Sequence, residues 1–364
     1  MMKSLYLHVP FCNHICAYCD FMRCGYYKPL ADQWLQAITK EIAEKQIQEV
    51  ETIYIGGGTP SSLSVEQVEH LLCLLDPYRA HVQEYTIEVN ADSFIDEKIA
   101  IFQKHGVNRI SLGAQTFQTE LLKTIQRVAD HAMIEDCILR LHKAGIKNIS
   151  LDLMYGLPGQ TMDLWKEDLR QAIALPIQHI SLYALTIEEN SAFGRAGIQP
   201  CDEDIEAQFY EEAITYLKKH GFEHYEISNF AKSGLQAKHN MSYWHYDDFY
   251  GIGCGASGKE DHVRYDNTRN LHTYITQGPS ATKILLNTTD EMFEMMMMGL
   301  RVQEGVSDIL FQKRFKCSLF LVFRLAIEKH LQLSNLRIKE DRIQTTYEGS
   351  LHLHDILLDF LPEK

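Results

Sequence analysis

The chain has 364 residues, which at about 150 residues per domain predicts roughly two domains. Hydrophobic residues make up 45% of it and charged residues 23%, as in ordinary globular proteins, which excludes the disordered and fibrous classes. Its 49 acidic residues outnumber the 35 basic ones and give a net charge of -14, so we expect no nucleic-acid partner, because such binding depends on neutralising phosphates. No apolar run reaches the roughly 18–20 residues of a membrane span. The first residues lack the pattern of a secretory signal, so we expect a cytoplasmic protein.

The first half of the chain alternates β-type runs with helical patterns. The runs predicted as strands are Ser4–Val9, Thr52–Ile55, Tyr85–Val89, Arg109–Leu112, Ile149–Leu153 and His179–Tyr183. The helices predicted between them are Leu30–Val50, Ser64–Leu75, Asp96–His105, Asp130–Ala144 and Met162–Ala174. Successive strand–helix units predict an α/β protein with a parallel sheet.

Polar or unusual residues stand near the end of each predicted strand. Cys12 follows the first, a run of three glycines follows the second, and Glu88, Asp152 and Tyr183 lie near the ends of later ones. An open sheet would gather such residues around one switch point, whereas barrels build their sites along the whole carboxyl edge. We therefore predict a partial (β/α)6 barrel of the TIM type.

The alternation becomes weaker after Gly197. A helix at Asp202–Lys219 and a strand at Glu223–Ile227 are readable, followed by a stretch rich in glycine and aromatic residues. The segment from Thr288 onward is mainly helical. We place a domain boundary between residues 1–280 and residues 281–364.

A cysteine cluster follows the first strand. Cys12, Cys16 and Cys19 have the spacing C-x3-C-x2-C, and soft thiolates select zinc, Cu(I) or iron–sulfur clusters. A structural zinc site needs a fourth ligand, which His8 or His14 could supply. A four-iron cluster normally takes four cysteines, so three leave one iron open to another ligand.

The cysteine spacing and the loop Gly56-Gly57-Gly58-Thr59-Pro60 together resemble the radical S-adenosylmethionine (SAM) superfamily. The resemblance implies a [4Fe-4S] cluster on Cys12, Cys16 and Cys19 with SAM on the open iron. It implies that Gly57, Gly58 and Thr59 face the methionyl part of SAM.

The same resemblance implies roles for residues that would otherwise be read as surface or structural. It assigns Arg127 to the SAM carboxylate, for which a planar guanidinium is suited, and Gln115 and Asp152 to the ribose hydroxyls. It assigns Glu88 to a polar group of SAM. Three further residues that it places beside the cluster or SAM are Tyr6, Tyr18 and Ala184.

Two related families share the strings Tyr6–Cys12 and Asp152–Thr161: the oxygen-independent coproporphyrinogen III oxidases (HemN) and the radical-SAM haem chaperones (HemW). The oxidases have a further cysteine where this chain has Phe21, and a longer segment before the cluster. The string His239-Asn240-Met241-Ser242-Tyr243-Trp244 is similar to the His-Asn-x-x-Tyr-Trp motif of the chaperones. We therefore identify the chain as a member of the chaperone family, with the oxidase as the alternative.

Membership of the chaperone family implies a protein that binds haem and delivers it to respiratory haem proteins, together with a smaller, winged-helix-like C-terminal domain. It implies an electron donor and no coproporphyrinogen oxidase activity, and leaves SAM cleavage open. Both a homodimer and peripheral membrane association are compatible with this function.

His239 is the candidate haem residue. A neutral imidazole is a common axial ligand, and Tyr243 and Trp244 offer flat apolar surface to a macrocycle. The alternative is a histidine satisfied by hydrogen bonds beside a packed tryptophan. One residue departs from the family pattern, because Ser257 replaces a loop histidine.

Other sulfur-containing residues have ordinary interpretations. We expect Cys24 to be a loop cysteine and the methionine run Met295–Met298 to belong to a helical core. The cysteines expected as small core residues are Cys73, Cys137, Cys201 and Cys317.

Overall fold

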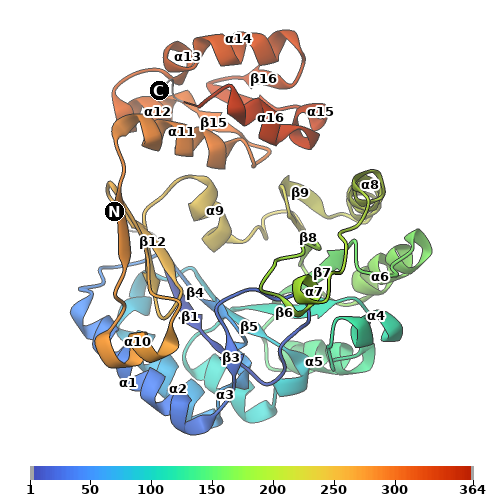
Figure 1. Ribbon diagram of the computed structural model, residues 1–364, viewed down its shortest axis with the longest axis vertical. Coiled ribbons are helices and arrows are strands. Elements are labelled where there is room, and N and C mark those ends of the chain that lie inside the picture. Colours follow the sequence, from blue (N-terminus) through green and yellow to red (C-terminus); the bar gives the residue numbers. More distant parts are fainter. Residues whose placement is uncertain (1–3, 362–364) are drawn as a thin grey trace.

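The computed structural model describes residues 4–361, which form a large α/β unit and a smaller C-terminal unit (Figure 1). The large unit is built on a 12-stranded sheet with the order β14-β13-β12-β11-β1-β4-β5-β6-β7-β8-β10-β9. The six parallel strands of its first half, in chain order, are β1 (Ser4–Val9), β4 (Thr52–Gly57), β5 (Glu84–Val89), β6 (Arg109–Gln115), β7 (Asn148–Tyr155) and β8 (His179–Ala184). Because they follow one another in spatial order and the sheet ends at β14 and β9, the partial barrel is confirmed.

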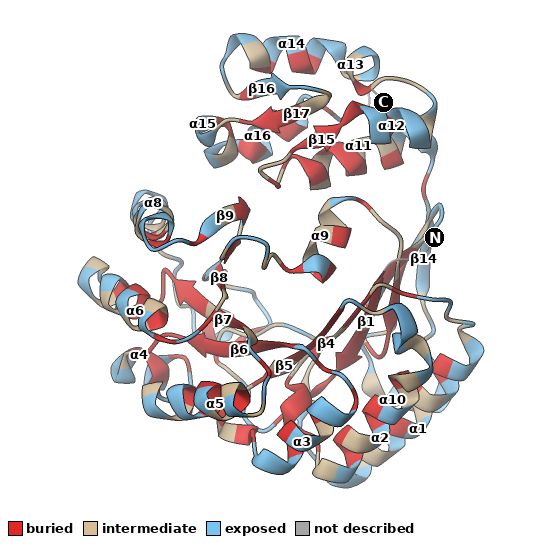
Figure 2. Cartoon of the chain, turned by 180° about the vertical axis from the view of Figure 1, so that it is seen from behind, coloured by how far each residue is buried: buried red, intermediate tan, exposed pale blue. Residues whose placement is uncertain are grey.

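Helices cover the outer face of these strands. They are α1 (Lys28–Glu44), α2 (Val65–Leu75), α3 (Asp96–Lys104), α4 (Thr119–Thr124), α5 (His131–Lys143) and α6 (Met162–Ala174). Figure 2 shows the buried strands enclosed by helices whose outer faces are exposed. The first helix ends earlier than the predicted Val50, because Gln46 adopts a left-handed backbone with φ 52° and Val50 is buried in the connection to β4.

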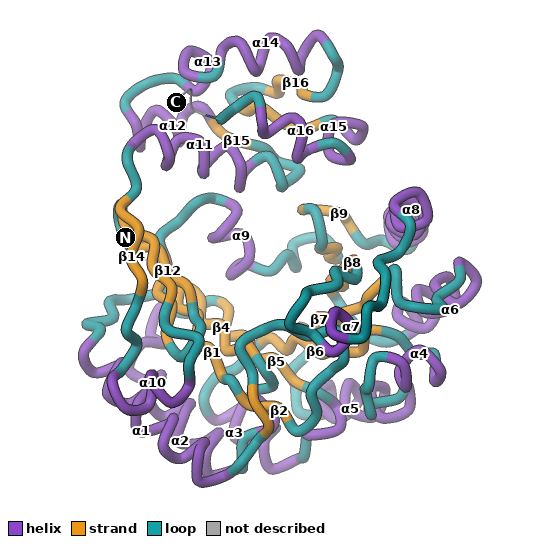
Figure 3. The backbone as a smooth tube through the Cα atoms, in the orientation of Figure 1, coloured by secondary structure: helices purple, strands orange, loops and turns teal. Residues whose placement is uncertain are grey.

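The stretch after Gly197 folds onto both edges of the sheet. Helices α7 (Ala192–Arg195) and α8 (Glu203–Lys219) precede the antiparallel edge strands β9 (Glu223–Glu226) and β10 (Asn229–Ala231). Helix α9 (Lys238–Trp244) then crosses to the other edge, as the tube in Figure 3 shows.

Strand β11 (Phe249–Ile252) pairs with β1 and is followed by β12 (Ser257–Glu260), β13 (Val263–Asp266), α10 (Leu271–Gln277) and β14 (Thr282–Leu285). These strands were not predicted, because each is only four residues long and a glycine interrupts the β pattern in β11 and β12. Position 251 must be a glycine, because the Cβ of any other residue there would lie 1.9 Å from the carbonyl oxygen of Ser257.

The C-terminal unit has its own core. Its helices are α11 (Thr288–Gly299), α12 (Asp308–Phe315), α13 (Leu319–Val322), α14 (Arg324–Gln332), α15 (Tyr347–Leu351) and α16 (Leu353–Leu358). They pack on a three-stranded sheet of β15 (Val306–Ser307), β17 (Arg342–Thr345) and β16 (Leu336–Lys339). The boundary after residue 280 stays a prediction, and β14, just beyond it, is still hydrogen-bonded to β13.

The sulfur-containing residues divide between core and surface. Met295, Met296 and Cys137 are buried as expected. The expectation for Cys73 is wrong, because this cysteine is exposed on α2. In residues 4–361, no helix has the length and apolar character needed to cross a membrane.

Candidate functional site

The cysteine loop is held between two short parallel strands, β2 (Phe11–Cys12) and β3 (Cys24–Gly25). The backbone nitrogen of Cys24 donates to Pro10 at 2.7 Å, and that of Tyr26 donates to Cys12 at 2.8 Å. Cys12 is buried, whereas Cys16 and Cys19 are partly exposed. The loop therefore presents three free thiols from one closed segment at the carboxyl end of β1.

The distances between these thiols limit the kind of metal centre that they can hold. A tetrahedral zinc ion holds its sulfur ligands about 3.8 Å apart, given Zn–S bonds of about 2.3 Å. Among residues 4–361, the only three-residue group of potential ligand atoms lying within 4.8 Å of one another is elsewhere, on α2 and directly after α3. At least one pair of the three thiols is therefore more than 4.8 Å apart, so their arrangement in this structure is not that of a closed zinc site.

The glycine loop after β4 lies directly against the thiols. Thr59 Oγ1 donates to Cys12 Sγ at 3.5 Å. A Cβ on Gly58 would lie 3.0 Å from Cys12 Sγ and 2.8 Å from the carbonyl oxygen of Phe11, so only glycine allows this approach. Burial raises the pKa of Cys12 to about 12, so this thiol ionises readily only when a cation compensates its charge.

Glu88, near the end of β5, has both carboxylate oxygens in hydrogen bonds. One accepts from the Tyr54 hydroxyl at 2.8 Å and the other from the Gly57 backbone nitrogen at 3.0 Å. Burial raises the pKa of Glu88 to about 7. Gly57 has a left-handed φ of 114°, and a Cβ there would lie 2.6 Å from the His8 ring.

Arg127 connects the cluster loop to the strand ends. Its Nη1 donates to Cys16 Sγ at 3.6 Å, and its Nη2 donates to the carbonyl oxygen of Gly113 at 2.7 Å and to Asn90 at 2.9 Å. Its Nε is enclosed and has no hydrogen-bond partner among the residues that the structure describes. A guanidinium with an unused donor fits the expected contact with an anionic ligand.

Gln115 is the last residue of β6, and Asp152 lies within β7, three residues before its end. A register shift between Gly113 and Gln115 places Gln115 in a left-handed conformation with φ 69°. Asp152 accepts from Ser111 Oγ at 3.1 Å, and burial raises the pKa of its carboxyl to about 6.

The remaining predicted residues lie around the same edge. The Tyr6 hydroxyl lies 3.0 Å from His8 Nδ1, and His8 Nε2 lies 2.8 Å from the carbonyl oxygen of Met22 in the cysteine loop. With both ring nitrogens in use, His8 is not free to act as a fourth metal ligand. Tyr18 is half-buried within the loop, and Ala184 is the last residue of β8.

A cavity of about 1180 Å³ opens beside this edge and extends to α9 and α11. It is lined by three predicted SAM-side residues, Tyr6, Gly57 and Glu88, and by His239. Its aromatic wall consists of Phe21, Tyr54, Tyr183, Tyr243, Trp244, Tyr246, Phe249 and Tyr265. The cysteines, Tyr18, Gly58, Thr59, Gln115, Arg127, Asp152 and Ala184 are not part of this lining.

His239 is buried in the wall of the cavity. Its Nδ1 lies 2.8 Å from Thr52 Oγ1 and its Nε2 lies 2.7 Å from the Tyr243 hydroxyl. Burial lowers the pKa of His239 to about 3, so the ring is neutral. Iron ligation by Nε2 would require Tyr243 to move, and the expected haem contact stays a prediction.

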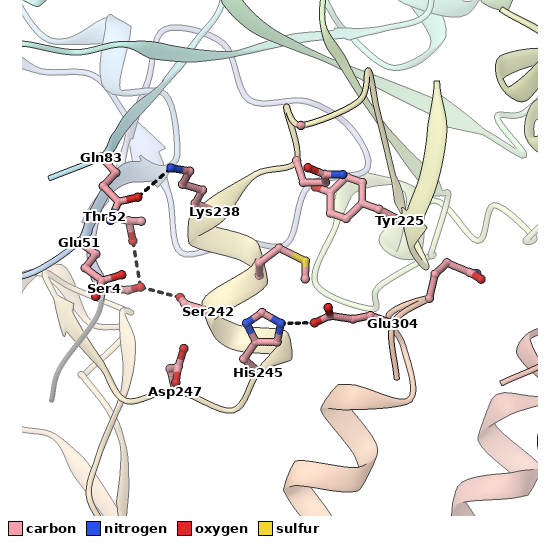
Figure 4. Close-up of a pocket in the computed structure, with 14 residues that line it drawn as sticks. Ser4, Glu51, Thr52, Gln83, Tyr225, Lys238, Ser242, His245, Asp247 and Glu304 are labelled. Atoms are coloured by element: carbon pink, nitrogen blue, oxygen red, sulfur yellow. Dashed lines mark hydrogen bonds and ion pairs between the residues drawn. The ribbon is translucent and has the colours of Figure 1, made fainter. Parts of the chain in front are cut away.

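Helix α9 separates this cavity from a second one of about 550 Å³. Figure 4 shows the second cavity, with Ser242 of α9 and His245, the residue directly after α9, on its wall. Ser4 Oγ lies 2.5 Å from Ser242 Oγ, and His245 pairs with Glu304. Thus α9 presents different residues to two cavities.

Sequence reasoning missed Tyr54, although it lies in a predicted strand. Its hydroxyl contacts Glu88 and its ring centroid lies 5.1 Å from that of His239. The alternation of strand residues was the available signal, because Thr52 and Tyr54 lie on one face of β4.

Comparison with known proteins agrees with this geometry. Residues 6–172 match the family model of the radical SAM superfamily, and residues 286–352 match the HemN C-terminal domain. The chain is 38% identical over 356 residues to a protein named Heme chaperone HemW from Lactococcus lactis, with 95% of this chain and 94% of that protein covered. It is 35% identical to the Bacillus subtilis protein of the same name, and both chains are covered fully.

The chain belongs to the HemW family. The identification made from the sequence is thereby confirmed. Among HemW proteins the Escherichia coli member is 34% identical, with 99% of this chain and 98% of that protein covered. The radical SAM superfamily, to which HemW proteins belong, implies a [4Fe-4S] cluster and SAM.

A solved structure supports the fold of this HemW family member. Coproporphyrinogen III oxidase (HemN) from Escherichia coli superposes with a TM-score of 0.86 at 22% identity, with 99% of this chain and 90% of that chain covered. At this identity the match shows a common fold.

Proposed function

We propose that this HemW family member binds haem in the 1180 Å³ cavity and delivers it to respiratory haem proteins in the cytoplasm. The observation that carries the proposal is the lining of that cavity, in which Glu88 and Gly57 of the SAM-side edge meet His239 and Trp244 of α9. One space thus adjoins both the radical-SAM residues and the chaperone motif.

The chemistry of the cavity wall suits a flat, largely apolar ligand with acidic groups. Its aromatic side chains provide faces and edges against which a macrocycle can pack. Its volume exceeds the roughly 300–1,000 Å³ of an ordinary ligand pocket. The basic residues Lys259, Arg264 and Arg269 also line it, and each is paired with an acidic residue that a ligand carboxylate can replace.

Trp244 provides a hydrogen-bond donor for the ligand. Its indole Nε1 is enclosed but has no hydrogen-bond partner within residues 4–361. A buried N–H without a partner costs free energy, and a polar ligand atom in the cavity would remove that cost. We place Trp244 against the ligand, with His239 behind it as either a neighbour or, after displacement of Tyr243, a ligand.

The cluster and SAM occupy the adjoining edge in this proposal. Cys12, Cys16 and Cys19 hold three irons of a [4Fe-4S] cluster, leaving the fourth iron for SAM. When bound, the cluster supplies an electron to SAM. Gly57, Gly58 and Thr59 offer backbone and hydroxyl groups to its methionyl part, and Arg127 offers the unused Nε to its carboxylate.

Other residues of the edge would complete the SAM site. Gln115 and Asp152 receive the ribose hydroxyls, Glu88 receives the SAM ammonium, and Tyr6, Tyr18 and Ala184 form the surrounding wall. An electron donor and a haem-accepting protein are the partners that this function requires. A cluster-dependent homodimer and peripheral membrane association are secondary proposals, open to sedimentation and vesicle binding.

Haem titration of the cluster-loaded protein, followed by the Soret band and by tryptophan fluorescence, tests the proposal. Haem in the large cavity should quench Trp244, so Trp244→Phe should remove most of the saturable quenching. His239→Ala should weaken binding or shift the Soret band, whereas His245→Ala, directly after the same helix but facing the second cavity, should not. Equal effects of both histidine variants, or no saturable binding, would contradict the proposed site.

The oxidase alternative has a direct test. The fold shared with coproporphyrinogen III oxidase favours it. Anaerobic incubation with coproporphyrinogen III, SAM and a reductant should give no decarboxylated product, and such a product would replace the chaperone proposal.

A further inference from the structure

We propose a second metal site on the outer face of the barrel, formed by Glu69 and Cys73 of α2 and by His105 directly after α3. One potential ligand atom from each residue lies within 4.8 Å of the other two, and no other group of this kind occurs in residues 4–361. The site is independent of haem, SAM and the cluster.

The spacing of the residues produces this convergence. Glu69 and Cys73 are four residues apart on α2, so they lie on the same face of the helix, one turn from each other. Helix α3 packs beside α2, and His105 follows its last turn. His105 is 2% exposed, whereas Cys73 is exposed, so the site is anchored on one side and open to solvent on the other.

The orientation of His105 is that of a metal ligand. Its Nδ1 lies 3.0 Å from both carboxylate oxygens of Asp76, so Nδ1 can donate to this carboxylate while Nε2 serves as the metal ligand. Nε2 faces Cys73 Sγ at 4.0 Å and Glu69 Oε1 at 3.3 Å. Without a metal, a proton on Nε2 can bridge to Glu69, and a cation bound between the two groups takes the place of that proton.

The donor set selects the ion. One thiolate, one imidazole and one carboxylate are the ligand types that zinc accepts, and three protein ligands plus water complete a tetrahedron. Binding of Zn²⁺ would displace the Cys73 thiol proton to solvent, so that thiolate and carboxylate balance the charge of the ion. Lys104, which pairs with Glu69 in the ion-free state, would be released.

The ligand atoms need little movement to reach bonding geometry. Zinc bonds of about 2.0–2.3 Å place tetrahedral ligands roughly 3.3–3.8 Å apart, against the 4.8 Å within which these atoms already lie. Rotation of the exposed Cys73 and the partly exposed Glu69 side chains can supply the difference, while His105 stays in place.

Zinc binding to the cluster-loaded protein tests the site. We expect one Zn²⁺ per chain with iron content unchanged, and a zinc X-ray absorption spectrum with one sulfur at about 2.3 Å and the other ligands nitrogen or oxygen. Cys73→Ser and His105→Gln should each weaken zinc binding by more than about 100-fold, because even outer-shell changes cost about 10–100-fold. Asp76→Asn should fall within that outer-shell range.

The controls use matched positions. Cys201→Ser removes a thiol elsewhere, and His70→Gln removes an exposed imidazole from α2 itself. Both should bind zinc as the unaltered chain does. Zinc bound by several sulfurs with loss of iron would mean displacement of the cluster, and binding insensitive to Cys73→Ser and His105→Gln would mean scattered surface binding. Either result overturns the proposal. Because Cys73 is exposed, its serine variant is expected to fold.

Discussion

The ring of Tyr54 lies against that of His239, with centroids 5.1 Å apart and planes inclined by 31°. The hydroxyl of the same tyrosine donates to Glu88 at 2.8 Å. One side chain therefore touches both the proposed SAM site and the proposed haem residue, which are separated by 151 positions in the sequence. Tyr54 therefore connects the two halves of the site directly.

Tyr54→Phe separates these two contacts. The variant loses the hydrogen bond to Glu88 and keeps the ring beside His239, so SAM binding should weaken while haem binding changes little. The bond from Tyr54 to Glu88 is internal to the protein, so its loss acts on SAM binding only through the position of the carboxyl group, and we expect the SAM dissociation constant to rise severalfold. Tyr85→Phe is the control, because the Tyr85 hydroxyl is buried without a partner in the described structure. Equal SAM affinity in the two variants would contradict the assignment of Glu88.

Glu88 predicts a pH dependence of stability. Burial raises the pKa of this carboxyl in the folded protein to about 7, so the folded state holds a proton that the unfolded state has lost. The free energy of unfolding should therefore fall as the pH rises from about 4.3 to 7 and level off above that. Glu88→Gln mimics the protonated group and removes this contribution. We expect the melting temperature of the glutamine variant, minus that of the unaltered chain, to be larger at pH 8 than at pH 5. A smaller difference at pH 8 would contradict the raised pKa of Glu88.

Gly58→Ala tests the close packing of the two loops. The added methyl group would lie 2.8 Å from the Phe11 carbonyl oxygen and 3.0 Å from Cys12 Sγ, so one loop must shift. We expect cluster content to fall severalfold, measured as iron and acid-labile sulfide per chain. Gly25→Ala is the matched control in β3, since nothing lies within 4 Å of its Cβ position. Full cluster occupancy in Gly58→Ala would show that the loops are less tightly packed.

The cysteine variants separate cluster ligands from a nearby thiol. Cys12→Ser, Cys16→Ser and Cys19→Ser should each abolish the iron absorption of the reconstituted protein. Cys24→Ser should retain it, because three ligands leave the fourth iron for SAM. Loss of the cluster in Cys24→Ser would instead indicate a four-cysteine cluster and would remove the open position.

The strand–helix alternation and the cysteine loop could be predicted because each depends on residues close in the sequence. The observed strands β1 and β5 match their predictions to within one residue, and helix α6 matches at both ends. The strands β11 to β14 were missed, because four-residue strands are held by their neighbours in the sheet and are too short to show a periodicity of their own.

The sequence by itself determined the family, and it placed the three cysteines proposed as cluster ligands in one loop at the carboxyl end of the first strand. Local spacing fixes which residues share a loop, and parallel strands bring their carboxyl ends together. Only the tertiary structure decided that α9 closes the cavity behind Tyr54, that Nε2 of His239 is already bonded to Tyr243, and that Cys73 meets His105. Those contacts join segments far apart in the chain, and their geometry depends on how helices pack, which no local pattern encodes.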